Sequence, residues 1–146
     1  MAITSAVCNS FKVEILKGVH NFTASSGNTF NLALYTSSAT LNKSTTAYST
    51  SNEISNTSGS AYSAKGKALT SVTPVLSTDT AVCDFADVSW TSASFTARGC
   101  MIFNDSHSTD ASVCVIDFGG DKTATSGTFT IQFPTADATN AIIRIA

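Results

Sequence analysis

Polar and apolar residues alternate along several short stretches of the chain, and this alternation predicts β-strands. In residues 29–36, Phe30, Leu32 and Leu34 occupy every second position between mostly polar or small residues. Successive side chains of a strand point to opposite faces, so this spacing gives the segment one apolar face. Residues 127–133 repeat the pattern. Both segments are therefore predicted to be strands that turn one face to a core.

The same criterion marks strands through the second half of the chain. The predicted strands are residues 29–36, 68–76, 81–85, 88–90, 93–104, 111–118, 127–133 and 141–145. Pro74 favours an edge strand or a bulge, and Gly119-Gly120-Asp121 indicates a turn. About eight short strands separated by turn signals predict an all-β fold, a single-domain β-sandwich that is Ig-like or jelly-roll-like.

One segment near the N-terminus has helical rather than alternating spacing. Its apolar stripe consists of Phe11, Ile15, Leu16 and Val19. Ser10 is a candidate cap at the start, and Gly18 can adopt the left-handed conformation at the end. We predict a short helix over residues 9–18 that plugs one end or edge of the sandwich.

Residues 37–66 form a polar excursion between the predicted strands. Ser, Thr and Asn dominate this segment, and its larger anchors are Leu41, Tyr48, Ile54 and Tyr62. One short strand is expected near residues 47–54. Long loops in compact domains are often functional, so Tyr48 and Tyr62 are candidates for exposed contacts. The whole chain, residues 1–146, is expected to form one domain, with residues 1–10 as an N-terminal docking arm.

The composition supports a β-rich chain with an unusually neutral surface. Hydrophobic residues make up 42% and charged residues only 12%, and Ser and Thr together account for roughly 30% of the 146 residues. Eight of the ten acidic residues are Asp, which prefers turns to helices. The formal net charge is −2 and the lysines and arginines are scattered, which argues against nucleic-acid binding. No apolar run is long enough to cross a membrane, and no secretory signal is expected.

The four cysteines lack the CxxC spacing of zinc ribbons. They are Cys8, Cys83, Cys100 and Cys114. Three of them lie in apolar, strand-like segments, which favours small buried side chains. A disulfide between Cys100 and Cys114 and a metal site are the less favoured alternatives.

The polar residues suggest no catalytic centre, because neither histidine belongs to a known nucleophile motif. His20 follows the predicted helix, where a cap or turn role is favoured, and His107 lies in a polar loop. Two acidic pairs could supply oxygen ligands for calcium, but turn formation is favoured for both. These pairs are Asp84 with Asp87 and Asp105 with Asp110. Trp90 is expected in the core rather than on a sugar-binding platform. We therefore expect no enzyme activity, no cofactor and no bound metal.

Several stretches in a fixed order resemble a family of small structural proteins of tailed-bacteriophage virions. They are Phe11-Lys12 with Gly18-Val19-His20-Asn21, Asn28-Thr29-Phe30 with Ala33-Leu34-Tyr35-Thr36, Ala86-Asp87-Val88-Ser89-Trp90, Ala97-Arg98 with Ile102-Phe103-Asn104-Asp105, Asp117-Phe118-Gly119, and Gly127-Thr128-Phe129-Thr130-Ile131. Together they run almost end to end, and residues 37–66 match least. The resemblance implies a non-enzymatic component of a phage particle, either a protein that decorates the capsid or one attached to the tail.

Two functions follow as expectations. The first is a capsid decoration or cement protein that binds the major capsid protein and itself, with a trimer favoured, and is located in the virion after assembly in the host cytoplasm. The alternative is a tail-associated adhesion module that contacts a host receptor or glycan. The expected interaction surface includes Ile3 and Val7 in the docking arm and Tyr48 and Tyr62 in the polar excursion. A short apolar extension can add a strand to a neighbouring sheet. Neither function involves nucleic acid or a membrane.

Overall fold

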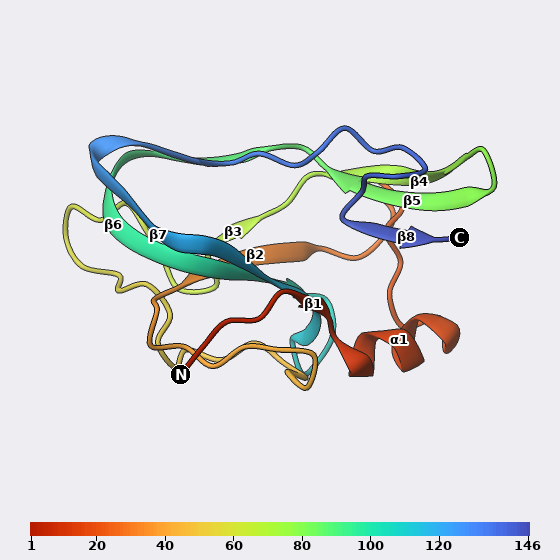
Figure 1. Ribbon diagram of the computed structural model, residues 1–146, viewed down its shortest axis with the longest axis horizontal. Helices are drawn as coiled ribbons and strands as arrows, with labels where there is room; N and C mark the ends of the chain where they lie inside the picture. The colour runs from red at the N-terminus through yellow and green to blue at the C-terminus, as the bar shows by residue number, and fades with distance from the viewer.

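The chain folds into two antiparallel sheets that form a single-domain all-β sandwich, described for all 146 residues in a computed structural model (Figure 1). The elements are β1 (Ala6–Val7), α1 (Asn9–Leu16), β2 (Phe30–Tyr35), β3 (Lys67–Ala68), β4 (Ser71–Ser77), β5 (Thr80–Phe85), β6 (Val88–Asn104), β7 (Ala111–Ile131) and β8 (Ile143–Ile145). One sheet has the order β1-β7-β6-β2-β3 and the other β4-β5-β8. The predicted sandwich of about eight strands is confirmed.

A long hairpin formed by β6 and β7 dominates the fold. The two strands are paired from Asn104 opposite Ala111 to Val88 opposite Ile131. The sequence predicted two separate strands in each of these regions, and that prediction is wrong. Register shifts interrupt the ladder in β6, including one between Trp90 and Ala93. At such irregularities the alternation of apolar and polar residues is interrupted, which in the sequence looks like the end of a strand, although the strand continues.

The Gly119-Gly120-Asp121 segment is a bend within β7, not the predicted turn between strands. Gly119 has a φ of +78°, a conformation that a residue without a Cβ adopts easily. Beside the bend, Nε of Arg98 donates a 2.9 Å hydrogen bond to Oδ1 of Asp117. Figure 1 shows the hairpin curving over at one end of the molecule, so that its two halves lie in different layers.

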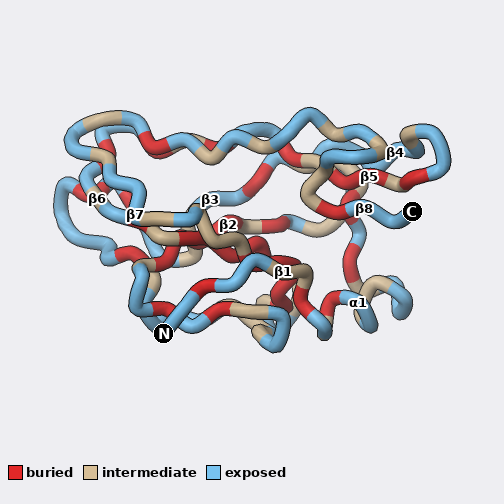
Figure 2. The backbone as a smooth tube through the Cα atoms, viewed as in Figure 1, coloured by how far each residue is buried: buried red, intermediate tan, exposed pale blue.

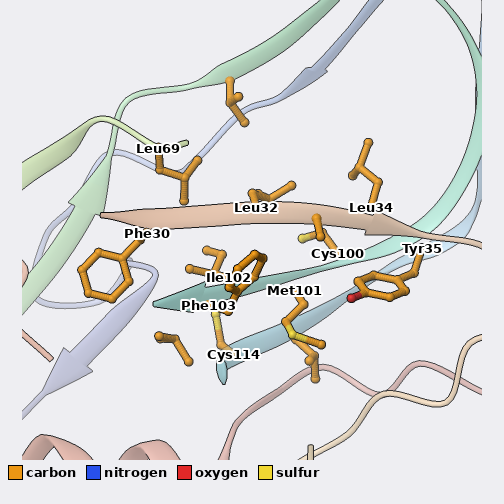
Figure 3. Packing of buried hydrophobic residues seen from close by; sticks show 14 of the residues in the cluster. Phe30, Leu32, Leu34, Tyr35, Leu69, Cys100, Met101, Ile102, Phe103 and Cys114 are labelled. Atoms are coloured by element: carbon orange, nitrogen blue, oxygen red, sulfur yellow. The ribbon is translucent and has the colours of Figure 1, made fainter. Parts of the chain in front are cut away.

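The core surrounds β2, which is buried on both faces. Figure 3 shows Leu32 and Leu34 on one side of the strand and Tyr35 on the other. All three side chains are fully buried. The segment before this strand adds a stacked ring, since Phe22 lies parallel to Phe30 of β2 with ring centroids 4.3 Å apart. The prediction of a strand here is confirmed, and the second buried face results from the polar excursion that covers it.

The polar excursion, residues 37–66, contains no regular strand, so the expected strand near residues 47–54 is wrong. The segment makes only isolated bridges, which pair Leu41 with Ile3, Ala47 with Ala111 and Glu53 with Tyr35. Its apolar anchors are nevertheless directed inward, and Leu41, Ile54 and Tyr62 are buried. The excursion is therefore a cover for one face of the five-stranded sheet.

Helix α1 lies at the end of the sandwich where β8 also lies (Figure 1). Phe11 is buried against the core, whereas Leu16, predicted on the same stripe, points to solvent. Ser10 does not cap the helix, which begins one residue earlier with Cys8 as its N-cap. The Ser10 hydroxyl is instead buried without a hydrogen-bond partner. The left-handed conformation predicted for Gly18 is present, with a φ of +72°.

Residues 1–10 are docked on the chain's own sheet rather than extended as a free arm. Ile3 forms a parallel bridge with Leu41, and Ala6 pairs with Val115 of β7. The amide of Cys8 donates a hydrogen bond to the Val113 carbonyl. Within this chain, the N-terminal segment therefore supplies the short edge strand β1.

Candidate interaction surface

Exposed large apolar side chains gather at one end of the molecule. Apart from Met1, every such side chain belongs to α1, β4 or β8. The set consists of Val13, Leu16, Val72, Val75, Leu76 and Ile145, and we call it the apolar end. Figure 1 places the three elements together at the end opposite the N-terminus, and Figure 2 shows pale, exposed backbone along them.

Strand β4 forms an unpaired edge of this surface. It is hydrogen-bonded to β5 on one side, with a register shift between Val72 and Val75, and makes no backbone hydrogen bond on the other side. Pro74 was predicted to mark an edge strand or a bulge, and it lies within this shift on an edge strand, so both alternatives are present. Val75 is 59% exposed and Leu76 is 70% exposed. An apolar edge of this kind is a template for pairing with another chain.

A small apolar crevice connects α1 to the three-stranded sheet. Its volume is about 140 Å³, and it is lined by Phe11, Ile15, Phe22, Pro74, Ala81, Val82, Cys83, Ile143 and Ile145. Residues of α1, β4, β5 and β8 all contribute to it, and Ile145 belongs both to the crevice and to the apolar end. A contiguous apolar patch on a monomer is often an interaction site.

A second hollow, which we call the β7 groove, has a volume of about 630 Å³. It is lined by Cys100, Ile116, Phe118, Lys122, Phe129, Thr130, Ile131, Gln132, Phe133, Pro134, Ala141 and Ile142. Residues from before and after the bend in β7 therefore face the same space, and the segment after β7 closes one side. Lys122 is the only charged residue in the lining.

The structure does not bring the sequence-predicted interaction residues together on the surface. Tyr62 is only 1% exposed, and Ile3 is also buried, so these two cannot form the predicted exposed contacts. Val7 and Tyr48 are half-buried. The ring of Tyr48 stacks on Phe103 with centroids 4.8 Å apart. These side chains hold the N-terminal segment and the polar excursion against the sheet.

Glu53 is the polar centre that fixes the excursion. Its carboxylate accepts hydrogen bonds of 2.6 Å from the hydroxyls of Tyr48 and Tyr62 and one of 2.8 Å from the amide of Lys65. Burial, with these hydrogen bonds to Glu53, raises the pKa of Tyr48 to about 12 and that of Tyr62 further. Both hydroxyls therefore remain protonated donors at neutral pH. The lone Glu in a Ser- and Thr-rich segment was the sequence signal for this centre.

Asp105 and Asp110 form a second polar cluster with Lys65. The ammonium of Lys65 lies 2.8 Å from Asp105 and 2.9 Å from Asp110. These hydrogen bonds raise the pKa of Lys65. The pair brackets the loop between β6 and β7, and its function in the structure is to tie that loop to the excursion.

His20 is buried in a polar network instead of taking the cap or turn role that the sequence favoured. Its Nε2 lies 2.7 Å from Glu14, and its Nδ1 lies 3.1 Å from Nδ2 of Asn104. Because Oδ1 of Asn104 accepts from the amide of Ser106, the Asn104 amide group donates to Nδ1. The Nε2 proton is then donated to Glu14. This network joins α1 to the end of β6.

The other polar candidates have local roles. His107 is half-buried, and its Nδ1 accepts a 3.2 Å hydrogen bond from the amide of Thr109. Asp84 and Asp87 accept backbone hydrogen bonds from Phe85 and Phe133. Asp84 lies within strand β5, and Asp87 binds the distant Phe133, so neither bond belongs to the turn that the sequence favoured. No group of three or more His, Cys, Asp or Glu side chains is arranged to hold a metal ion.

The four cysteines are buried and unpaired, and Trp90 is buried as predicted. Burial raises the pKa of Cys83 and of Cys100 to about 12 and that of Cys114 well above its usual value. The thiolate is the reactive form of cysteine. All three are consequently inert packing residues at neutral pH.

The apolar end was missed because strand prediction counts apolar positions without asking which face they occupy. The available signal was the adjacent pair Val75-Leu76, which interrupts alternation and forces one apolar side chain away from any single core.

No family model, curated protein or solved structure matches the chain. No helix of the structure is long and apolar enough to span a membrane.

Proposed function

We propose that this chain is a non-enzymatic structural protein of a tailed-phage virion, and that it decorates the head and cements neighbouring capsid subunits. The observation that carries the proposal is the concentration of exposed apolar side chains at the apolar end. A surface of this kind gains free energy when another protein covers it. The assignment to a phage particle is supported by the sequence resemblance that runs almost end to end.

The energetics favour assembly through many weak contacts. Full burial of an exposed Val, Leu or Ile side chain contributes about 1.5–3 kcal/mol. Several such residues give a modest affinity at each contact, because part of this gain offsets the loss of translational and rotational freedom. On a particle with many equivalent positions, linked contacts raise the overall stability without any stronger individual site.

The first partner is the major capsid protein, which α1 would contact through Leu16. This side chain is 89% exposed and Val13, on the same helix, is also exposed. The neutral surface supports docking by shape and apolar contact rather than by charge. The protein then resides in the virion after assembly in the host cytoplasm.

The tail-associated adhesion module is the less favoured alternative. It requires exposed aromatic residues in the polar excursion for contact with a host receptor or glycan. Tyr62 is buried, and the hydroxyl of Tyr48 is bound to Glu53 while its ring stacks on Phe103. These rings contribute to internal packing, which favours the head over the tail.

The proposal of a non-enzymatic role is supported by the surroundings of both histidines. His20 exchanges hydrogen bonds with Glu14 and Asn104, and His107 does so with Thr109. Neither is hydrogen-bonded to a cysteine, and Thr109 itself lies in an exposed loop rather than a shielded cavity. General acid–base chemistry needs a positioned proton donor or acceptor facing a substrate site.

The test is the number of copies per major capsid subunit in purified particles. Head decoration predicts a fixed stoichiometry near that of the capsid lattice, whereas a few copies per particle would contradict it and favour the tail. Leu16→Lys is expected to reduce binding to particles lacking this protein by about tenfold or more, as loss of about 1.4 kcal/mol implies. Ser37→Lys, at an exposed position outside the apolar end, is the matched control and should bind normally.

A further inference from the structure

The β7 groove is an apolar site that the chain itself leaves open. Its volume of about 630 Å³ lies within the range of about 300–1,000 Å³ found for binding pockets in proteins. Phe118 and Phe129, from opposite sides of the bend, approach with ring centroids 6.4 Å apart. Of the lining residues only Cys100 and Phe129 are buried, and most of the other apolar side chains of the wall are half-buried.

The strand that forms the groove also has an unpaired edge. From Asp117 to Ile131, the backbone ladder of β7 pairs only with β6. The edge strand β1 covers β7 only opposite Ala6 and Val7. Apolar wall and free backbone edge therefore occur together, as in sites that accept a strand from another chain.

The hairpin of β4 and β5 has the complementary properties. It projects from the three-stranded sheet with a two-residue connection, Thr78-Asp79, between paired Ser77 and Thr80. Its outer edge is free, and Val75 and Leu76 on that edge are exposed. Asp79 at its tip is the hairpin's exposed charged residue.

We propose that the β7 groove receives the β4–β5 hairpin of a second copy of this chain. Leu76 and Val75 would cover the apolar wall, and Asp79 would approach Lys122, the only charge in the lining. The hairpin of the same chain is fixed in its own sheet by the ladder between β5 and β8. A second copy is therefore the source of the hairpin. This inference rests on the proposed assembly function and specifies the contact between copies of the chain within that assembly.

The arrangement also defines the kind of oligomer. Hairpin and groove are different surfaces, so each copy gives one and accepts another in a head-to-tail contact. Head-to-tail contacts produce either a closed ring or an open filament, and the trimer favoured from the sequence is the ring that we expect. An interface of standard size buries about 800 Å² on each partner, roughly a tenth of the 7319 Å² surface of this chain. The Asp79–Lys122 pair would set orientation, because an exposed ion pair contributes little affinity.

The test is the mass of the purified full chain in solution by light scattering and sedimentation. The expected result is a species of three times 15.1 kDa. Leu76→Lys should shift it to the monomer. Asp79→Lys and Lys122→Asp should each weaken association by about threefold to tenfold, as an exposed ion pair changed to a like-charge pair implies. The double variant Asp79→Lys with Lys122→Asp should restore association. All three substituted positions are exposed, and thermal unfolding will check that each variant is folded.

Other results would overturn the inference. A wild-type monomer, an oligomer unaffected by Leu76→Lys, or a double variant no better than the single ones would each do so. A monomer that retains an added mass in native mass spectrometry would identify a small apolar ligand as the occupant instead.

The two proposals fail separately. A monomer that still binds particles overturns the hairpin exchange and leaves the virion function standing. An oligomer with the expected charge-reversal behaviour that never enters particles supports the exchange and overturns the virion function.

Discussion

The hydroxyl of Tyr62 donates a 2.6 Å hydrogen bond to Oε1 of Glu53 and accepts one of 2.9 Å from the amide of Leu34. This side chain joins the polar excursion to strand β2, as does the hydrogen bond from the Ile54 amide to the Leu34 carbonyl. Tyr62 also stacks on Trp90 with ring centroids 6.0 Å apart. A segment without regular secondary structure is thus held in place by polar contacts that bury its tyrosines.

Substitution of Glu53 should loosen this attachment. Glu53→Ala removes the acceptor for Tyr48, Tyr62 and the amide of Lys65, so buried donors lose their partners. The expected loss in the free energy of unfolding is about 3 kcal/mol, measured by denaturant titration. Tyr48→Phe, which removes one half-buried donor and keeps the ring, should cost only about 1 kcal/mol. Equal losses for the two variants would contradict the central role of Glu53.

The same tyrosines predict a weakening of the fold at high pH. Burial and the hydrogen bond to Glu53 raise the pKa of Tyr48 to about 12, whereas an unfolded tyrosine titrates near pH 10. The folded state therefore retains a proton that the unfolded state releases, and the free energy of unfolding decreases as pH rises from about 10 through about 12. Denaturant titrations across this interval will measure it. Tyr62→Phe should flatten the decrease, and a flat wild-type profile would refute the argument.

Gly66 and Gly59 form a matched pair for testing close packing. Both have positive φ, +65° and +85°, but a Cβ on Gly66 would lie 1.8 Å from the Leu32 carbonyl oxygen, while Gly59 has nothing within 4 Å. Gly59→Ala is expected to cost about 1–2 kcal/mol from backbone strain alone. Gly66→Ala should cost clearly more, because β2 must move. Thermal unfolding of the two variants will compare them, and equal costs would show that β2 adapts freely.

The buried thiols should be unreactive in the folded protein. Burial raises the pKa of Cys83 and Cys100 to about 12, so almost no thiolate exists at neutral pH. A chromogenic disulfide reagent should react slowly with the native chain and rapidly after denaturation in guanidinium. The denatured chain should then show four reactive thiols, the number in the sequence. Rapid labelling of the native protein would indicate that the core opens readily.

The sequence predicted strands correctly where apolar and polar residues alternate only because the segment is a regular strand. Residues 29–36 alternate because they form a regular strand, and the structure has β2 there. The prediction of a turn at Gly119 and Gly120 is wrong. These glycines indicate a change of chain direction, but they do not show whether the pairing of β7 with β6 ends there. The adjacent Val75 and Leu76 were assigned to a strand, but their exposure depends on sheet order. Tyr62 was expected to be exposed because it lies in a polar segment, and the sequence does not show that its hydroxyl has a buried hydrogen-bond partner in Glu53.

Strand order also determines when each strand can pair during synthesis on the ribosome. The first strand completes its ladder only with Cys114 and Val115, and β5 lacks one neighbour until Ile143 to Ile145 emerge. The hairpin of β6 and β7 can zip outward from its own turn, since its earliest pairs are close in sequence. A nascent chain can therefore pair β1 and complete the three-stranded sheet only after these later residues have left the ribosome, and its open strand edges are accessible to chaperones until then.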